Sequence, residues 1–379
     1  MLVATSVIGD VRVTREAIAL AEAGHHVQVL GRDVPVAGTV GAGVELFSAT
    51  GGAGLRRPGP RKVGQGPALQ RAARWLLLPE HRRRTFGRWA RGAERLADEL
   101  DFDVVHAHDY TALALGDRVA RARGVRLVYD THELWSERHR SGRPTPIEDR
   151  WQRAREQRLG ARAAVVLTVG EALGDRLRDA YQWQHVAVVR NTFPLPSASA
   201  SAPPSTPVAA VYAGRLGPGR DLETVAAASA SVELALRLVG PADPSWIARF
   251  VPRHCHVGPA VAADEVDGLL RVGGLALVTL TDGWGNHRVA LPNKLFQAVS
   301  AGVPVVASDI GELARTVREH GVGVLYRSGD ARSLVAAIED AVLRYPQLQQ
   351  AVQRAQGALS WSVDRDRLLG VYRDLEAAG

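Results

Sequence analysis

Short apolar runs alternate with amphipathic segments along both halves of the chain. The runs are rich in valine, alanine and leucine, and the segments between them carry apolar residues at helical spacing. Strands that are buried on both faces of a parallel sheet are apolar throughout, and a helix that returns over the sheet follows each of them. The pattern therefore predicts an α/β protein with two doubly wound parallel sheets.

The predicted strands form two sets. The first half contains MLVATS, HHVQVLG, VELFSA, DVVHAHD, VRLVYDTH, AAVVLTVG and VAVVRN, and the second half contains VAAVYAG, LALRLVGP, HCHVGP, LALVTLT, VPVVASD and VGVLYR. The clearest helix of the first half covers residues 14–23. In the second half, helices begin at Leu222, at Ala263 and beside Asn293.

A segment of prolines and small polar residues, 194–207, separates the two sets. Because these residues have little to bury, we predict a linker. The predicted organisation is an N-terminal domain over 1–193, the linker over 194–207, a C-terminal domain over 208–358 and a final helix over 359–379. Trp361 and Tyr372 give this helix an apolar face that must pack on another element.

The net charge of +7 is unevenly distributed. Residues 56–95 contain twelve basic residues and only two acidic ones, and we predict a basic helical insertion there. Such a block is either a solvated arginine-rich surface or a contact for an anionic membrane or an acidic acceptor. No segment resembles a nucleic-acid-binding module, so nucleic acid is not an expected partner.

Cysteine and long apolar runs are scarce. Cys255 is the one cysteine, so an internal disulfide and a cysteine metal cluster are excluded. No apolar run approaches the roughly 20 residues of a membrane-spanning helix, and the first residues form a short strand, not a leader. We expect a cytoplasmic protein, with peripheral contact with an anionic membrane as the alternative.

Lysine is rare in this chain, and one lysine lies at the start of a helix. Lys294 is one of only two lysines among 47 basic residues, and it follows Pro292 and Asn293. The helix dipole favours an anion at this end by about 0.3–1 kcal/mol, so a cation is poorly placed there unless an anion binds beside it. We predict that Lys294 binds a diphosphate.

Two other turns at strand ends fit the same ligand. Gly9 follows the first strand, where the N–H groups of a helix start can bind an anion. Arg215 and Arg220 lie on the glycine-rich loop AGRLGPGRD, and guanidinium groups bind phosphate with a permanent charge. Each feature alone also fits a plain turn or surface arginines. Together, without a Walker A pattern or paired aspartates at a strand end, they favour a nucleotide-sugar diphosphate bound without metal.

Histidines lie at the strand ends of the first half. His132 in VYDTHELW stands between Asp130 and Glu133, and VHAHDY places His106, His108 and Asp109 at the end of the neighbouring strand. A metal site is the alternative, but the sequence has no helical HExxH and no third ligand at a defined spacing. We therefore expect no metal and no cofactor, with His132 facing a cleft between the domains.

The order of these motifs resembles that of the retaining glycosyltransferases of family 4. The resemblance spans essentially the whole chain and is carried by IGDVRVTREAIALAEAGHHVQVLG, DVVHAHDYTALALG, LVYDTHELW, AGRLGPGRDLETV, LRLVGP, ALPNKLFQAVSAGVPVVASDIGELARTV and GVGVLYRSGD. It implies the GT-B fold, in which two Rossmann-like domains face each other across a cleft and the last helix crosses back to the N-terminal domain. It also implies sugar transfer from a nucleoside diphosphate sugar, a UDP sugar being favoured, to an acceptor hydroxyl with retention of anomeric configuration.

The resemblance further implies roles for single residues. The implied catalytic residues are His132, Arg215 and Lys294. The implied donor-binding residues are Gly9, Arg215, Arg220, Asn293, Lys294 and Leu295 for the diphosphate and Gly240, Val257 and Gln297 for the nucleoside. The acceptor-side candidates are His108, Asp109 and Glu133. The acceptor itself is either a small molecule of secondary metabolism or a lipid-linked precursor of a cell-envelope glycan.

The chain departs from the family at residues that are expected to bind the nucleoside. Gln297 stands where the family has a glutamate that holds the ribose hydroxyls, and Val289 where many members have a second glutamate. An amide can still hydrogen bond but lacks the charge assistance of a carboxylate. Gln297 therefore leaves open a non-catalytic partner subunit that binds a nucleotide sugar. A sugar-nucleotide 2-epimerase is a second alternative, because the GT-B fold can also serve an isomerase.

Overall fold

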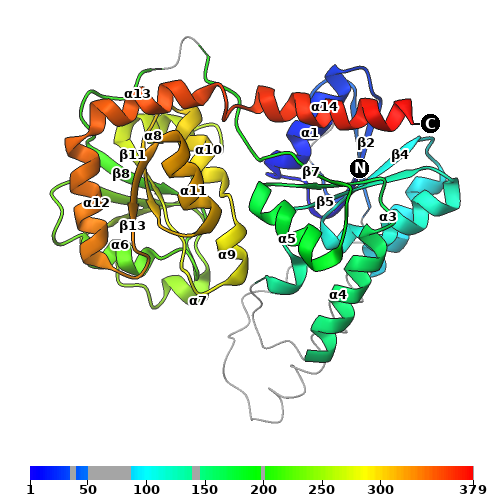
Figure 1. Ribbon diagram of the computed structural model, residues 1–379, viewed down its shortest axis with the longest axis horizontal. Coiled ribbons are helices and arrows are strands. Elements are labelled where there is room, and N and C mark those ends of the chain that lie inside the picture. Colours follow the sequence, from blue (N-terminus) through cyan, green and yellow to red (C-terminus); the bar gives the residue numbers. More distant parts are fainter. Residues whose placement is uncertain (35–39, 50–86, 139–145, 198–200, 379) are drawn as a thin grey trace. The chain divides into compact units, whose positions relative to one another are not determined.

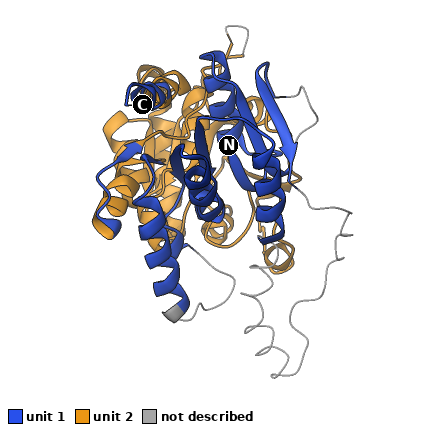
Figure 2. Ribbon diagram, turned by 90° about the vertical axis from the view of Figure 1, so that its right-hand side faces the viewer, with its two compact units in different colours: residues 1–167, 181–187, 369–379 blue, residues 168–180, 188–368 orange. Residues whose placement is uncertain are grey.

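The chain forms two compact units (Figure 2). The structure, a computed structural model, describes residues 1–34, 40–49, 87–138, 146–197 and 201–378. Unit 1 comprises residues 1–167, 181–187 and 369–379, and unit 2 comprises residues 168–180 and 188–368. Contacts thus assign the segments 168–180 and 188–193 to unit 2, whereas the predicted limit of the N-terminal domain lies at residue 193. Most of the predicted basic insertion, residues 50–86, lies outside the described residues.

The first sheet has seven strands in the order β3-β2-β1-β4-β5-β6-β7, of which β2, β4, β5 and β7 are labelled in Figure 1. They are β1 (Leu2–Ser6), β2 (Val27–Asp33), β3 (Val44–Ser48), β4 (Val104–His108), β5 (Arg126–Thr131), β6 (Val165–Thr168) and β7 (Val186–Val188). β1 pairs in parallel with β2 and β4, and β4 pairs in parallel with β5. Each strand coincides with a predicted apolar run, so the predicted α/β architecture is confirmed for this half.

Helices connect these strands. They are α1 (Val11–Glu22), α3 (Asp109–Arg123), the short 3-10 helix η1 (Trp135–Glu137), α4 (Pro146–Gly160) and α5 (Glu171–Tyr181), with a further helix over residues 87–98. α1 starts before the predicted residue 14, because the Asp10 side chain accepts the N–H of Val13 at 3.2 Å and so caps an earlier turn. The buried residues Val13, Ala17 and Leu20 fix the orientation of α1 on the sheet.

The last helix, α14 (Trp361–Ala377), begins in unit 2 and ends in unit 1. Its first turn is anchored in unit 2, where the buried Asp364 accepts hydrogen bonds from the Arg190 side chain at 3.1 Å and from Thr192 Oγ1 at 2.8 Å. In unit 1, the Tyr372 hydroxyl lies 2.9 Å from His106 Nδ1. The prediction that the final helix packs on the N-terminal domain is therefore confirmed.

The second sheet has six strands in the order β10-β9-β8-β11-β12-β13. They are β8 (Ala209–Ala213), β9 (Ala235–Val239), β10 (His256–Gly258), β11 (Gly274–Val278), β12 (Val305–Ser308) and β13 (Gly323–Tyr326), and the paired strands are parallel. Both sheets are doubly wound, with the strand order reversing at β1/β4 in the first and at β8/β11 in the second. Ligands bind such sheets outside the carboxyl ends of the strands at these points.

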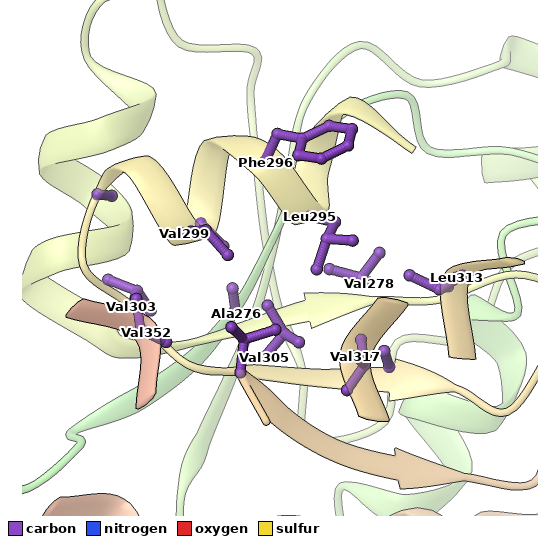
Figure 3. Close-up of a cluster of buried hydrophobic side chains, with 14 of the residues drawn as sticks. Ala276, Val278, Leu295, Phe296, Val299, Val303, Val305, Leu313, Val317 and Val352 are labelled. Carbon is purple, nitrogen blue, oxygen red and sulfur yellow. The ribbon is translucent and has the colours of Figure 1, made fainter. Parts of the chain in front are cut away.

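The helices between β8 and α14 lie in unit 2 and cover its sheet on both faces. They are α6 (Leu222–Ala228), α7 (Pro244–Ile247), α8 (Val266–Gly273), α9 (Gly285–Val289), α10 (Asn293–Ser300), α11 (Gly311–His320), α12 (Ala331–Leu343) and α13 (Tyr345–Gln356). α8 starts after the predicted Ala263. Leu295 and Val299 point from α10 into the core formed with strands β11 and β12 (Figure 3). This packing fixes the start of α10, and with it the position of Lys294.

None of the helices in the described part of the chain combines the length and the apolar character that a membrane crossing requires.

Candidate functional site

Three predicted residues follow strand ends at the reversal point of the first sheet. Gly9, exposed and with a φ of 78°, makes the turn from β1 into α1. β4 ends at His108 and α3 begins at Asp109, whose φ of 61° is unusual for a residue with a side chain. His132 comes directly after the neighbouring strand β5. The sheet therefore gathers Gly9, Asp109 and His132 at one edge, as the sequence predicts.

A buried ion pair supports this edge. Arg12 on α1 donates from Nε and Nη2 to the two carboxylate oxygens of Asp130, at 2.7 and 2.8 Å. Arg12 Nε also lies 3.0 Å from Glu16 Oε1, and none of the three side chains is more than 2% exposed. Burial opposes the charge of Asp130, but Arg12, together with His132 and the hydrogen bonds from the histidines, holds the pKa of Asp130 well below its usual range. Burial raises the pKa of Glu16 to about 7 although Arg12 is close.

His132 is held between two carboxylates. Its Nε2 lies 3.3 Å from Asp130 Oδ2 and its Nδ1 lies 3.4 Å from Asp109 Oδ1, and the side chain is 28% exposed. Burial favours a neutral ring, but Asp109 and Asp130 outweigh it and raise the pKa of His132 to about 9. His132 is therefore an imidazolium at neutral pH, and both ring nitrogens are donors.

Two further histidines lie beneath the edge and do not reach solvent. His106 and His108 stack with 4.3 Å between ring centroids, and they are 1% and 2% exposed. His108 Nδ1 lies 3.1 Å from Asp130 Oδ2. The burial of His108 corrects its expected place on the acceptor side, because the ring cannot touch an acceptor directly. Asp109 and Glu133 stay candidates for that contact, since both are half-buried.

The same cluster bears on the metal question. Glu16, His106, His108 and Asp130 offer ligand atoms within 4.8 Å of one another. The guanidinium of Arg12, however, contacts both carboxylates and supplies the cation between them. With His132 as a second cation, the charges of Glu16 and Asp130 are balanced without a metal. These residues therefore fit an internal ion network better than a metal centre, and the expectation of a metal-free site stays a prediction.

Lys294 in unit 2 lies against the end of β8. Its Nζ is 4.9 Å from the centroid of the Tyr212 ring, a cation–π contact. Gly214, with a φ of 148°, makes room for the lysine, since a Cβ at this position would lie only 2.4 Å from Lys294 Cε. Gly240, at the end of β9, is a glycine for a similar reason, because its Cβ would lie 2.0 Å from Gly214 O. Gly214 thus allows the lysine stem to pass the end of β8, and Gly240 allows the end of β9 to approach Gly214.

The cations at this edge have few anionic partners. Arg215 is exposed and lies 3.5 Å from Asp243, whereas no carboxylate of the described residues lies within ion-pair distance of Lys294 or Arg220. Burial, and then the charge of Arg220, lower the pKa of Lys294 to about 7. The predicted diphosphate residues Arg215, Arg220 and Lys294 therefore leave a net positive charge at the reversal point of the second sheet.

The other residues predicted to bind the donor differ in their exposure and in their contacts. Asn293 is exposed at the start of α10, but the Leu295 side chain is fully buried and its N–H donates to Pro292 O at 3.0 Å. Val257, 40% exposed, lies on the edge strand β10 next to β9. Gln297 Nε2 donates to Asp267 Oδ1 on α8 at 2.9 Å, which leaves its carbonyl oxygen to accept. Their roles in donor binding stay predictions.

Sequence reasoning did not identify Arg12, Glu16 or Tyr212 as part of these sites. A signal existed for the first two, because Arg12 and Glu16 are four residues apart and so share one stripe of α1 with its buried apolar residues. Tyr212 is one apolar residue of a buried strand, and nothing in the sequence separates it from its neighbours.

Comparison with known proteins accounts for most of the chain. Residues 10–195 match the family Glycosyltransferase Family 4, and residues 208–343 match Glycosyl transferases group 1. The chain is similar to D-inositol 3-phosphate glycosyltransferase 1 of Catenulispora acidiphila, with 28% identity over 74% of each chain. It is also similar to phosphatidyl-myo-inositol mannosyltransferase of Mycobacterium leprae, with 36% identity over 22% of this chain and 24% of that one.

Solved structures show the same fold over nearly the whole length. Sucrose-phosphate synthase from Thermosynechococcus elongatus has a TM-score of 0.74 at 17% identity, covering 100% of this chain and 99% of that one. HepE of Anabaena in complex with UDP-glucose has a TM-score of 0.68 at 16% identity, covering 98% of each chain. The chain belongs to glycosyltransferase family 4, with the GT-B fold and the activity of a transferase that uses a nucleoside diphosphate sugar.

Proposed function

We propose that the protein moves a sugar from a nucleoside diphosphate sugar to an acceptor hydroxyl with retention of anomeric configuration and without a metal ion. The observation that carries this proposal is the uncompensated positive charge of Lys294 and Arg220 at the end of β8. A diphosphate supplies the missing negative charge. As the glycosidic bond breaks, the leaving diphosphate gains charge, and fixed cations stabilise that charge in the transition state.

His132 is the proposed contact to the transferred sugar. Its Nε2 faces the fully buried Asp130, so this side is part of the fold. Its Nδ1 faces Asp109 at 3.4 Å, and both of these side chains are about 30% exposed. A sugar hydroxyl can therefore replace Asp109 at Nδ1 and accept a hydrogen bond from a charged ring. The acceptor hydroxyl loses its proton to the departing phosphate on the same face of the sugar.

The relatives guide the choice of ligands. HepE of Anabaena was solved with UDP-glucose, which supports a UDP sugar as the donor. The names of both similar enzymes contain an inositol group, one as a soluble phosphate and one as a phospholipid. We therefore propose inositol, an inositol phosphate and phosphatidylinositol as the first acceptors to test.

A donor and acceptor screen tests the function. We expect release of free nucleoside diphosphate from one of the UDP, GDP or dTDP sugars only when an acceptor is present, with a mass increase of one sugar on that acceptor. Tight donor binding by calorimetry without release under any acceptor would instead indicate a partner subunit. Conversion of the donor into its 2-epimer would indicate the epimerase.

Vesicle flotation separates the two acceptor classes. Helix α4 exposes Arg150, Arg153 and Arg158 around Trp151, which is 48% exposed. For a lipid-linked acceptor we expect flotation with vesicles of phosphatidylserine and phosphatidylcholine at low salt, weakened at physiological salt and reduced by Trp151→Ser. Phosphatidylcholine vesicles alone are the control. If the protein does not float at low salt, the lipid-linked acceptor is rejected and a soluble acceptor is the remaining hypothesis.

A further inference from the structure

A continuous chain of buried contacts joins the C-terminal helix to His132. The Tyr372 hydroxyl on α14 lies 2.9 Å from His106 Nδ1. His106 stacks on His108, whose Nδ1 lies 3.1 Å from Asp130 Oδ2. The same oxygen of Asp130 lies 3.3 Å from His132 Nε2. All of these residues belong to unit 1, and the members between Tyr372 and His132 are at most 2% exposed.

We propose that Tyr372 is a positioning residue, whose hydroxyl acts through His106 and Glu16, which shares Arg12 with Asp130, to set the charge of His132. The proposal rests on the proposed role of His132 at the transferred sugar. Tyr372 itself is buried and touches neither donor nor acceptor. Its effect on sugar transfer is therefore indirect. Through Tyr372, the C-terminal helix α14 influences the site around His132.

The first step is the tautomer of His106. Burial raises the pKa of Tyr372, so the hydroxyl keeps its proton, and burial also lowers the pKa of His106, so this ring is neutral. A phenol is the stronger donor and an imidazole nitrogen the stronger acceptor, so the favoured arrangement is donation from the hydroxyl to Nδ1. The single ring proton of His106 then sits on Nε2, which faces Glu16 Oε2 at 3.7 Å. Tyr372 thus directs an N–H at the buried carboxylate.

The second step runs from Glu16 to the site. The N–H of His106 favours the ionised form of Glu16, which shares Arg12 with Asp130. Without the Tyr372 hydroxyl, His106 is free to adopt the other tautomer and to present a lone pair to Glu16. Glu16, whose pKa of about 7 leaves it only partly ionised at neutral pH, then becomes mostly protonated. Negative charge is lost near His132, and the imidazolium becomes easier to deprotonate.

The direction of this effect follows from the groups around both ends of the chain. Those around His132 are Asp130 of β5, Asp109 of α3, Arg12 and Glu16 of α1, and His108 of β4. Those around Tyr372 are His106, the carboxylates of Glu16 and Asp130 and, at 5.5 Å between ring centroids, His25, which pairs with Glu376. The carboxylates outweigh the cations in their effect on His132, so the loss of one carboxylate charge lowers its pKa.

The test compares Tyr372→Phe with Tyr181→Phe. Tyr181 is a matched control, because it is also buried in unit 1 and its hydroxyl donates to Glu156 at 2.6 Å in a separate cluster with Tyr129. For Tyr372→Phe we expect a histidine NMR titration in which the pKa of His132 falls by about 1 unit. His132 then still carries its proton at neutral pH, so we expect the alkaline fall of kcat to move about 1 pH unit lower, with an unchanged KM for the donor. Tyr181→Phe loses only thermal stability.

The two proposals can fail separately. If His132→Ala transfers sugar at the normal rate, the proposed role of His132 is wrong, and the NMR titration still decides the role of Tyr372. If the titration of His132 is the same in Tyr372→Phe as in the unmodified protein, the positioning role is overturned. A stoichiometric metal ion in the purified protein would also overturn it, since the ion would hold His106 and His108. Should Tyr372→Phe not fold, His106→Gln carries the same expectation and the same criterion.

Discussion

Replacing Lys294 by methionine is expected to lower kcat by about a hundredfold to a thousandfold, the loss that follows removal of one donor to a developing negative charge. Methionine keeps the unbranched apolar stem that passes Gly214 and the Tyr212 ring, so the fold of unit 2 is preserved. Steady-state kinetics of donor cleavage with a saturating acceptor measure the effect. Arg288→Met is the matched control, because it removes an exposed cation of the same unit that pairs with Asp282.

Arginine at position 294 is expected to restore little of this activity. The lysine stem already runs 2.4 Å from the place where a Cβ of Gly214 would lie, and a guanidinium is wider than an ammonium. This constraint gives a physical reason for lysine at this helix start in a chain whose other basic residues, apart from Lys62, are arginines. A kcat of Lys294→Arg close to that of the unmodified protein would contradict the assignment of a tightly enclosed ammonium.

The pH dependence of nucleotide binding gives the same variant a second readout. Free Lys294 has a pKa of about 7, and a bound diphosphate favours the charged amine, so binding raises this pKa and takes up a proton. Affinity is therefore full below pH 7 and falls as pH rises above it, by up to about tenfold per pH unit. Calorimetry in buffers of different ionisation enthalpy measures the proton uptake. Uptake that persists in Lys294→Met would place the titrating group elsewhere.

The fold was predictable from the sequence because its strands are buried on both faces. Residues 275–278 of the strand β11 are apolar on both faces, so the sequence alone predicts a strand covered on both sides, as in a parallel sheet. Helix starts were less predictable. α1 and α8 begin at Val11 and Val266, because the local hydrogen bonds around each start, such as that from Val13 to Asp10, determine where helical geometry begins.

The site was predictable where polar chemistry stands at the end of a strand or at the start of a helix. His132 and Arg215 follow strand ends and Lys294 lies in the first turn of a helix, so the sequence identifies them. Arg12 and Glu16 read as an ordinary charged pair on a helix surface, and only the packing of α1 on the sheet buries them beside Asp130. The partner of Gln297, Asp267, comes from a different helix, and no spacing along the chain connects the two.

Replacing Asp130 by asparagine is expected to lower the free energy of unfolding by about 3–5 kcal/mol, because it leaves the charge of Arg12 buried with only Glu16 as a partner. Asparagine has the same shape, so the loss reflects the charge and not a cavity. Urea unfolding followed by circular dichroism measures it. Asp309→Asn is the control, since its pair with Arg318 is about half exposed and is expected to cost less than about 1 kcal/mol.

The sign of the pH dependence separates a charge effect from a packing effect. Arg12 holds the pKa of Asp130 well below its usual range in the folded protein, so the stabilisation is present above about pH 4 and is lost as pH falls. The difference in unfolding free energy between Asp130→Asn and the unmodified protein should therefore shrink in acid. A difference that is constant with pH, or one below about 1 kcal/mol at pH 7, would show that another group balances the positive charge of Arg12. The buried ion pair would then not be what holds His132 in place, because the same carboxylate binds both residues.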